Sequence, residues 1–360
     1  IVVEGWEDTY QSWLHDAAIK VEVNDDVENA LESGARLLAR WSDAKDSKLS
    51  AADKKVLRDA AKAMEDKSLS AEERLAAAQS SDIERLHETN PLRDGLSESN
   101  PQRFCVERPK SSFASWYQFF PRSEGAYYGE DGKIVPGNLK TSVAGLERAA
   151  AEGFNIVYLP PIFPIGVTNR KGRNNTLIAG PHDPGSPFGI GSELGGHDTV
   201  DPLLGTMDAF KAFCAHAHEL GIEVALDFAL QCSPDHPWVK QHPNWFRTKP
   251  DGTIAFAENP PKKYQDIYPI DFNADMEGIE AETERIMDLW IKAGVTIFRV
   301  DNPHTKPVRF WQDVIAAVTK KHPETLFLAE AFTRPGMMRA LSYAGFTQSH
   351  CYFPWRNTKE

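Results

Sequence analysis

Apolar residues recur at helical spacing over the N-terminal part of the chain. The clearest series is formed by Val27, Leu31, Leu38 and Trp41. Such spacing places the side chains on one face of a helix. Two segments, 50–53 and 70–73, begin with serine and carry an acidic residue three positions later, as capping boxes at helix starts do. The pattern predicts a helical bundle over 7–98, with a peptide-binding helix as the alternative interpretation.

From residue 103 onward, short apolar runs alternate with longer amphipathic segments. This alternation is typical of βαβ units, whose strands form a parallel sheet. Six strands are predicted, near 113–120, 155–159, 222–228, 296–301, 326–330 and 346–353. Helices are predicted over 142–152, between Thr206 and Gly221, and before Gly294. The predicted fold class is therefore α/β, a (β/α)₈ TIM barrel truncated after about its sixth strand.

Two of the predicted loops are much longer than the others. One follows the second strand, at about 161–205, and the other follows the third strand, at about 229–274. Long loops inside a compact domain are usually functional, and loops that follow barrel strands lie at the catalytic end. We expect both to build a substrate cleft, with 229–274 forming an inserted subdomain of a catalytic domain that spans 103–360.

The charge and cysteine content limit the classes of partner and cofactor. Among 360 residues there are 40 Lys and Arg against 52 Asp and Glu, which gives a net charge of −12. This balance opposes nucleic acid and anionic membranes as partners. No signal peptide, long apolar span or zinc-like spacing is evident, so we predict a cytoplasmic protein with no metal and no cofactor. The four cysteines, read as reduced thiols, are Cys105, Cys214, Cys232 and Cys351.

Two of the predicted strands end on a carboxylate. The run Ile-Phe-Arg-Val leads to Asp301, and the run Leu-Phe-Leu-Ala leads to Glu330. Residues at the C-terminal ends of barrel strands are the catalytic ones. Two carboxyl groups suit glycosyl chemistry, in which one attacks the anomeric carbon and the other transfers the proton. We predict Asp301 as nucleophile and Glu330 as acid/base, and expect a structural role for Asp227 at the third strand's end.

Arg299 is the third predicted catalytic residue. It precedes Asp301 by two positions, so both side chains point to one face of the strand. A guanidinium beside a carboxylate keeps it ionised and fixes its geometry. Two structural alternatives stay open at this point. Arg299 and Asp301 can form a purely structural pair, and Glu330 can be a buried residue paired with Arg334 or Lys306.

Two basic loops suggest an anionic substrate. Segment 258–264 combines prolines with two lysines and Tyr264, and segment 170–175 combines lysine and arginine with glycine and asparagine. Lysine supplies point charge and tyrosine a hydrogen bond to a phosphate. An exposed basic loop without function is the alternative for each. In an acidic chain, this concentration of cations on two barrel loops favours a pocket for an anion.

Four stretches together resemble one enzyme family. They are Lys-Gly-Arg-Asn-Asn at 171–175, the segment 258–269, Phe-Arg-Val-Asp-Asn-Pro-His-Thr-Lys-Pro at 298–307, and Ala-Glu-Ala-Phe-Thr-Arg-Pro at 329–335. The chain resembles the GlgE-type maltosyltransferases of the alpha-amylase superfamily, glycoside hydrolase family 13. The resemblance extends over essentially the whole chain, helical region included.

The resemblance implies a reaction and a set of roles. The family transfers maltosyl from α-maltose 1-phosphate to the non-reducing end of an α-1,4-glucan, with retention and without a cofactor. It implies Asp301 as nucleophile, Glu330 as acid/base and Arg299 as support of the nucleophile. The implied phosphate-binding residues are Lys262, Tyr264 and Asn302. The implied sugar-binding residues are Lys171, Asn175, Gln231 and Asn259. The helical region is expected to help form a homodimer.

The resemblance also carries departures and open alternatives. Gln231-Cys232 stands where many amylases have Asn-His, which weakens any expectation of calcium. The superfamily's third carboxylate follows strand seven and is expected beyond residue 360. We therefore expect a fragment, with 1–6 as the tail end of a missing N-terminal β-domain. An amylase-type hydrolase or transglycosylase acting on neutral α-glucans is the first alternative function, and a non-catalytic glucan-binding fragment is the second.

Overall fold

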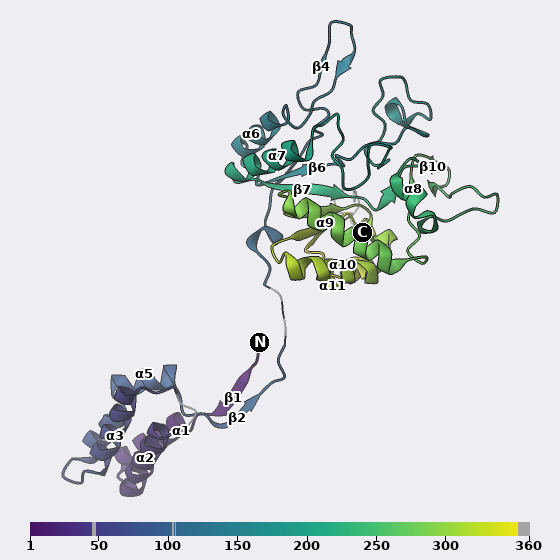
Figure 1. Cartoon of the computed structure of the whole chain (residues 1–360). Coiled ribbons are helices and arrows are strands. Elements are labelled where there is room, and N and C mark those ends of the chain that lie inside the picture. Colours follow the sequence, from purple (N-terminus) through teal and green to yellow (C-terminus); the bar gives the residue numbers. More distant parts are fainter. Residues whose placement is uncertain (45–47, 103, 105, 352–360) are drawn as a thin grey trace, which may run out of the picture. The chain divides into compact units, whose positions relative to one another are not determined.

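The computed structural model describes residues 1–44, 48–102, 104 and 106–351. The chain separates into two compact units, Ile1–Val106 and Glu107–Glu360 (Figure 1). No helix in the described part of the chain is both long and apolar enough to cross a bilayer.

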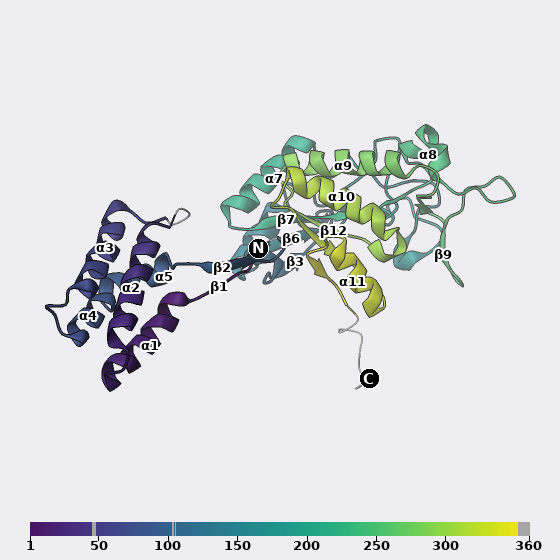
Figure 2. The same ribbon diagram turned by 90° about the horizontal axis from the view of Figure 1, so that it is seen from below.

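In its described residues, the first unit has five helices flanked by two short strands. The helices are α1 (Thr9–Val23), α2 (Val27–Ser42), α3 (Ala51–Glu65), α4 (Ala71–Ala78) and α5 (Ser81–Thr89) (Figure 2). Their apolar faces meet around Leu31, Leu38 and Trp41, which are fully buried. The two predicted capping boxes are confirmed, because Ser50 and Ser70 each exchange hydrogen bonds with the acidic residue three positions later.

The helical prediction is wrong for the last residues of 7–98. Here β2 (Asp94–Glu98) pairs antiparallel with β1 (Glu4–Glu7). Pro91 follows the last helix and cannot extend it, and Gly95 adopts a φ of 63° that suits a turn or bulge rather than a helix. The segment that follows the last helix is therefore extended and forms a two-stranded ribbon with β1.

The second unit is built on a parallel sheet whose strands follow one another in space as they do in sequence. Its strands are β3 (Trp116–Gln118), β6 (Ile156–Leu159), β7 (Glu223–Phe228), β12 (Ile297–Val300), β13 (Leu326–Ala329) and β14 (Gln348–Ser349). Each strand pairs in parallel with the next. All six predicted strand positions are confirmed, although residues 352–353 of the last one lie outside the described residues.

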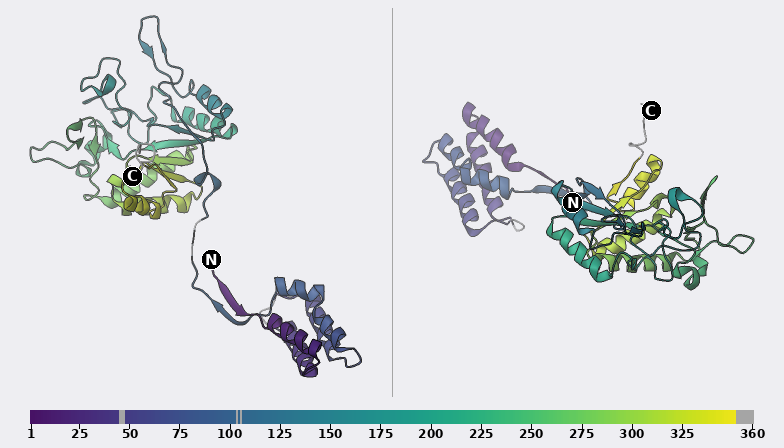
Figure 3. Two further views of the ribbon diagram at one scale, coloured as in Figure 1. Left: turned by 180° about the vertical axis from the view of Figure 1, so that it is seen from behind. Right: turned by 90° about the horizontal axis from the view of Figure 1, so that it is seen from above.

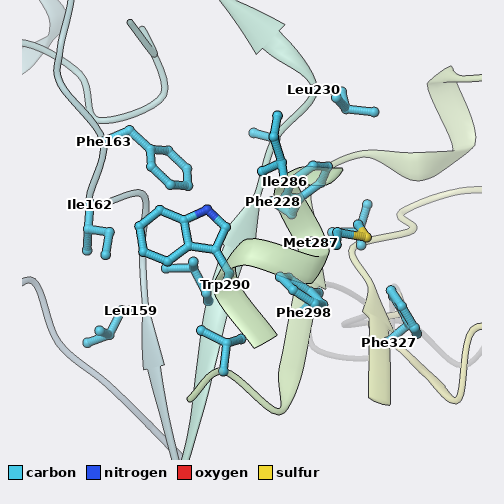
Figure 4. Close-up of a cluster of buried hydrophobic side chains, with 14 of the residues drawn as sticks. Leu159, Ile162, Phe163, Phe228, Leu230, Ile286, Met287, Trp290, Phe298 and Phe327 are labelled. Carbon is cyan, nitrogen blue, oxygen red and sulfur yellow. The ribbon is translucent and has the colours of Figure 1, made fainter. Parts of the chain in front are cut away.

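Helices connect these strands and cover one side of the sheet (Figure 3). They are α6 (Val143–Ala151), α7 (Met207–Glu219), α9 (Met276–Lys292), α10 (Val308–Lys321) and α11 (Pro335–Tyr343). Helix α6 packs beside α7, and α9 beside α10. The helix–sheet interface is apolar, with Trp290 of α9 near Phe163 and Phe228 (Figure 4). Burial of such large apolar surfaces fixes each strand in register and so fixes its terminal residue.

The two long loops contain short elements of their own. The first holds a 3₁₀ turn at Arg173–Asn175. The second holds β8 (Gln231–Cys232), α8 (Pro237–Gln241), β9 (Ala257–Asn259), β10 (Lys262–Tyr264) and β11 (Tyr268–Pro269). Strands β9 and β10 form a hairpin, and β11 returns to pair with β8. A smaller hairpin follows β3, between β4 (Tyr127–Tyr128) and β5 (Ile134–Val135).

Candidate active site

A cleft of about 2070 Å³ opens at the carboxyl ends of the strands in the second unit. Eight of the ten residues predicted from the sequence line it. They are Asn175, Gln231, Asn259, Tyr264, Arg299, Asp301, Asn302 and Glu330. These residues come from segments far apart in the sequence, so the parallel sheet and its long loops bring them together.

Arg299 lies at the centre of the cleft floor. Its Nη1 is 2.8 Å from Asp227 Oδ2 and 3.1 Å from Asp301 Oδ1, and its Nη2 is 2.6 Å from Glu330 Oε1. The side chains of Arg299, Asp227 and Asp301 are each less than a tenth exposed. One buried guanidinium therefore holds three carboxyl groups from neighbouring strands, which the planar fork of arginine allows and a lysine does not.

Asp301 and Glu330 occupy matching positions on adjacent strands. Val300 of β12 pairs with Ala329 of β13, and the amide of Glu330 donates to the Val300 carbonyl at 3.0 Å. The next residue on each strand is the predicted catalytic carboxylate, so the two side chains point to the same side. The Asn302 side-chain amide also donates to Asp301 Oδ2 at 3.2 Å.

Burial and charge set different protonation states in this cluster. Burial and a hydrogen bond with Asp301 together raise the pKa of Glu330 to about 7, although Arg299 acts in the opposite direction. Glu330 therefore keeps a proton near neutral pH, as an acid/base catalyst needs. Its ion pair is with Arg299, so the alternative that paired Glu330 with Arg334 or Lys306 is not what the structure has.

Asp227 and Tyr158 both contact the guanidinium of Arg299. Asp227 is fully buried, burial raises its pKa to about 7, and it accepts hydrogen bonds from Arg299 and from the Tyr158 hydroxyl. The guanidinium also lies 5.7 Å from the centre of the Tyr158 ring. Asp227 acts through Arg299, in keeping with the structural role expected for it. Tyr158 is not among the site residues predicted from the sequence. A tyrosine near the end of an otherwise apolar strand could have indicated a polar side chain at the cleft floor.

The polar residues of the long loops form the outer wall of the cleft. Gln231 of β8 donates from Nε2 to the Phe188 carbonyl at 3.1 Å. Asn259 and Tyr264 come from the paired strands β9 and β10. Asn175 lies in the first long loop, in a left-handed conformation with φ 62°. These side chains present amides and a hydroxyl to the cleft, the groups that hydrogen-bond sugar hydroxyls.

Two of the predicted lysines do not line the cleft. Lys171 is buried behind its wall, where Nζ donates to Gln265 Oε1 at 2.9 Å and lies 3.9 Å from Asp266 Oδ1. Lys262 is exposed on β10. Asp266, which is not among the predicted site residues, does line the cleft, and burial raises its pKa. Lys171 thus reaches the cleft only through Asp266.

One buried cluster in the described residues has the composition of a metal site. His197, Cys232 and His236 bring their ligand atoms within 4.8 Å of one another. Trp238 N–H donates to His236 Nδ1 at 3.0 Å, so His236 carries its proton on Nε2. That proton faces His197 Nδ1 at 3.0 Å, and His197 donates from Nε2 to the Ala229 carbonyl at 2.8 Å.

This hydrogen-bond chain does not fit a metal ion. A metal bound to His236 Nε2 would require a ring without either proton, because Nδ1 already accepts from the backbone. Burial lowers the pKa of His197 to about 4 and that of His236 to about 2. Both rings are therefore neutral near pH 7. The histidine pair joins the two long loops through hydrogen bonds and ring contacts.

The described cysteines are free thiols. Cys214 and Cys232 are buried, and Cys351 is partly buried. Burial raises the pKa of the Cys214 thiol to about 12, and burial also raises that of Cys232. Such thiols are inert packing groups. Cys105 lies outside the described residues.

Similarity to known proteins agrees with this site. Residues 1–108 match the family described as "Alpha-1,4-glucan:maltose-1-phosphate maltosyltransferase, domain N/S". The enzyme of that name from Bifidobacterium longum is 80% identical over 361 residues, covering 100% of this chain and 48% of the relative. The chain is thus similar to maltosyltransferases over its whole length. A maltosyltransferase from Streptomyces coelicolor is 52% identical over 358 residues, and the match covers 99% of this chain and 52% of that relative.

The chain spans about half the length of the curated maltosyltransferases it matches. Solved structures place the second unit in the alpha-amylase fold. An alpha-amylase from Lactobacillus plantarum matches with 30% identity and a TM-score of 0.50, and the match covers 65% of this chain and 49% of the amylase chain. A noncanonic maltogenic alpha-amylase from Thermotoga neapolitana matches with 25% identity and a TM-score of 0.53, and the match covers 69% of this chain and 50% of the amylase chain.

Proposed function

We propose that the natural protein carrying this chain is a retaining maltosyltransferase. It moves maltosyl from α-maltose 1-phosphate to the non-reducing end of an α-1,4-glucan and releases phosphate. The observation that carries the proposal is the pairing of Asp301 and Glu330 on one buried guanidinium, in a chain that is 80% identical to the Bifidobacterium longum maltosyltransferase.

The strand geometry supports retention rather than inversion. Asp301 and Glu330 follow paired residues of adjacent strands, and such strands lie about 4.8 Å apart. Retaining enzymes place their two carboxyl groups about 5–5.5 Å apart, whereas inverting enzymes need a wider gap for a water molecule. The cleft floor thus suits a double displacement.

In the first step, a carboxylate oxygen of Asp301 attacks the anomeric carbon of the donor. The bond from that carbon to the bridging phosphate oxygen breaks, and its electron pair leaves with phosphate. Glu330 donates its proton to the leaving oxygen. Arg299 orients the Asp301 carboxylate, and the product is a β-maltosyl ester of Asp301.

In the second step, the 4-hydroxyl of the acceptor glucan attacks the same carbon. Glu330, now ionised, removes the hydroxyl proton as the new carbon–oxygen bond forms. The ester bond to Asp301 breaks and the carboxylate is regenerated. Two inversions at one carbon give net retention, and each step uses a group that Arg299 already orients.

The wall residues have roles that remain proposals. Lys262, Tyr264 and Asn302 bind the phosphate and stabilise its charge as it leaves. Since Lys262 is exposed on a hairpin, its long side chain turns into the cleft when the donor is bound. The sugars are held by Lys171, Asn175, Gln231 and Asn259. Lys171 acts through Asp266, whose carboxylate it faces.

The wider architecture is also part of the proposal. The six parallel strands form part of an eight-stranded barrel, and 229–274 is a subdomain inserted after its third strand. The ribbon of β1 and β2 is exposed on both strands, as expected for the end of a further β-domain. The helical unit contributes to a homodimer. We also propose a cytoplasmic location, and on charge we expect neither nucleic acid nor anionic membranes as partners.

The test uses the natural protein with α-maltose 1-phosphate and a short malto-oligosaccharide. Phosphate release is followed together with product length, and Asp301→Ala serves as the inactive control. Phosphate released in step with products that grow by two glucose units supports the proposal. Oligosaccharides that are shortened or redistributed without phosphate release would instead identify an amylase-type hydrolase or transglycosylase.

A further inference from the structure

Lys306 lies at the active site but has no role in the reaction described above. It follows the 3₁₀ turn η4 (Pro303–Thr305) and lines the cleft. Its Nζ donates to the Asp301 carbonyl and to the Asn302 carbonyl, each at 3.2 Å. The lysine thus binds the backbone of the predicted nucleophile and of the residue after it.

The backbone that Lys306 binds has an unusual conformation. Asn302 adopts a left-handed conformation with φ 44° and ψ 51°, which a residue with a side chain rarely adopts without support. The Asn302 carbonyl is also an acceptor for the Thr305 hydroxyl at 2.8 Å. This turn directs both Asp301 and Asn302 into the cleft, so the ammonium group stabilises the conformation that presents them.

Lys306 also balances the charge of the cluster. Asp227, Asp301 and Glu330 can carry three negative charges, against the positive charges of Arg299 and Lys306. Burial lowers the pKa of Lys306, and the three carboxyl groups oppose that shift. Because burial raises the pKa of both Asp227 and Glu330 to about 7, the cluster is partly protonated near neutral pH, and the two cations offset the charge that remains. Removing Lys306 would leave the buried carboxylates in excess, which is costly at low dielectric.

We propose that Lys306 is a positioning residue for maltosyl transfer: it holds the turn that presents Asp301 and Asn302 and offsets the charge of the carboxyl cluster, without touching the substrate. The inference rests on the proposed function. It differs from the role of Arg299, which binds the carboxylate groups themselves, because Lys306 binds the backbone that carries them.

Two variants separate the charge from the geometry. Lys306→Met keeps the length of the side chain but removes the charge and the donors. Lys306→Arg keeps the charge but cannot place a single ammonium between the two carbonyls. The matched control is Lys320→Met, on the exposed side of α10. Each is assayed in the natural protein for phosphate release over a range of donor concentrations and pH.

For Lys306→Met we expect kcat to fall about 10- to 100-fold, because the reacting groups are misplaced, while KM for the donor changes less than about threefold. Both limbs of the pH profile should move to higher pH, because loss of a nearby cation favours protonated carboxyl groups. Lys306→Arg should restore the position of the profile but only part of kcat. The ionisable groups that face the cluster are Tyr158, Asp227, Arg299, Asp301, His304, Glu330 and His350.

Other outcomes would overturn the inference. An unchanged pH profile with reduced kcat would leave Lys306 a merely structural residue, and a large rise in KM at constant kcat would make it a substrate ligand. Hydrogen exchange of residues 301–306 needs no substrate, and Lys306→Met should accelerate it relative to Lys320→Met. If the natural protein shows no transfer while this exchange result holds, the proposed function fails and the turn-holding role stands.

Discussion

Arg299 Nη2 and Glu330 Oε1 form an ion pair of 2.6 Å across two adjacent parallel strands. The same guanidinium reaches Asp301 through Nη1. The proposed acid/base and the proposed nucleophile therefore share one orienting group, and disturbing that group should affect both steps of the proposed reaction.

Arg299→Lys tests this sharing. Lysine keeps the positive charge but is a point donor, so it cannot hold Asp227, Asp301 and Glu330 in their present geometry. We expect kcat to fall by about 100-fold or more, measured as phosphate release. The control is Arg285→Lys on the partly exposed face of α9, and near-normal kcat in Arg299→Lys would contradict the shared role.

Glu330→Gln should separate the two steps. Phosphate leaves readily, so the first step can proceed slowly without a proton donor, but glutamine cannot accept the proton of the acceptor hydroxyl. We expect a maltosyl ester to accumulate on Asp301 after incubation with the donor, visible by mass spectrometry of the intact protein. The double variant with Asp301→Asn should show no added mass. Full transfer activity in Glu330→Gln would remove this residue from its role.

The pH dependence of kcat/KM for the donor should reflect the protonated cluster. The first step needs Glu330 with its proton, and burial together with Asp301 raises the pKa of Glu330 to about 7. Activity should therefore decline as pH rises through about 7. Because burial also raises the pKa of Asp227 to about 7, the observed value belongs to the coupled cluster. A constant kcat/KM between pH 6 and pH 9 would contradict the assignment.

Glu223 should make the stability of the fold, rather than the activity, depend on acidic pH. Burial raises its pKa, but Arg108, Lys110 and Thr296 hydrogen-bond the carboxylate and lower the pKa from 4.5 to about 2. Because the folded value lies below the unfolded one, the stabilisation is complete above pH 4.5 and is lost as pH falls towards 2.

Glu223→Gln should therefore lower the free energy of unfolding at pH 7 by roughly 2 kcal/mol. It should also flatten the loss of stability between pH 4.5 and pH 2. Urea unfolding at several pH values measures both effects. Glu193→Gln, at an exposed position, is the control, and equal behaviour of the two variants would show that the ion pairs add nothing.

The strand positions, and the carboxylates at the ends of the strands, could be predicted because their signals are local. An apolar run that ends on Asp301 or Glu330 shows both where a strand lies and what lies at its end. Register then follows from burial, so the two carboxylates meet without any long-range information. The confirmed capping boxes at Ser50 and Ser70 are local signals of the same kind.

The remaining features depend on contacts between distant segments. The positions of Lys171 and Lys262 relative to the cleft are set by how the loops fold back on Gln265 and Asn259, which no spacing reveals. Asp94–Glu98 is a strand only because residues near position 4 pair with it. In each case the partner lies many residues away.

The hydrogen-bond chain through His197 and His236 has a direction that starts at the Trp238 amide and ends at the Ala229 carbonyl. Replacing one ring by an apolar residue would leave a buried donor or acceptor of the other ring without a hydrogen-bond partner. This should lower the free energy of unfolding by about 1–3 kcal/mol. Single substitutions at either position should therefore be harmful where a joint replacement is tolerated. Each ring therefore limits which residues the other position can accept, so the two long loops are constrained together at this one contact.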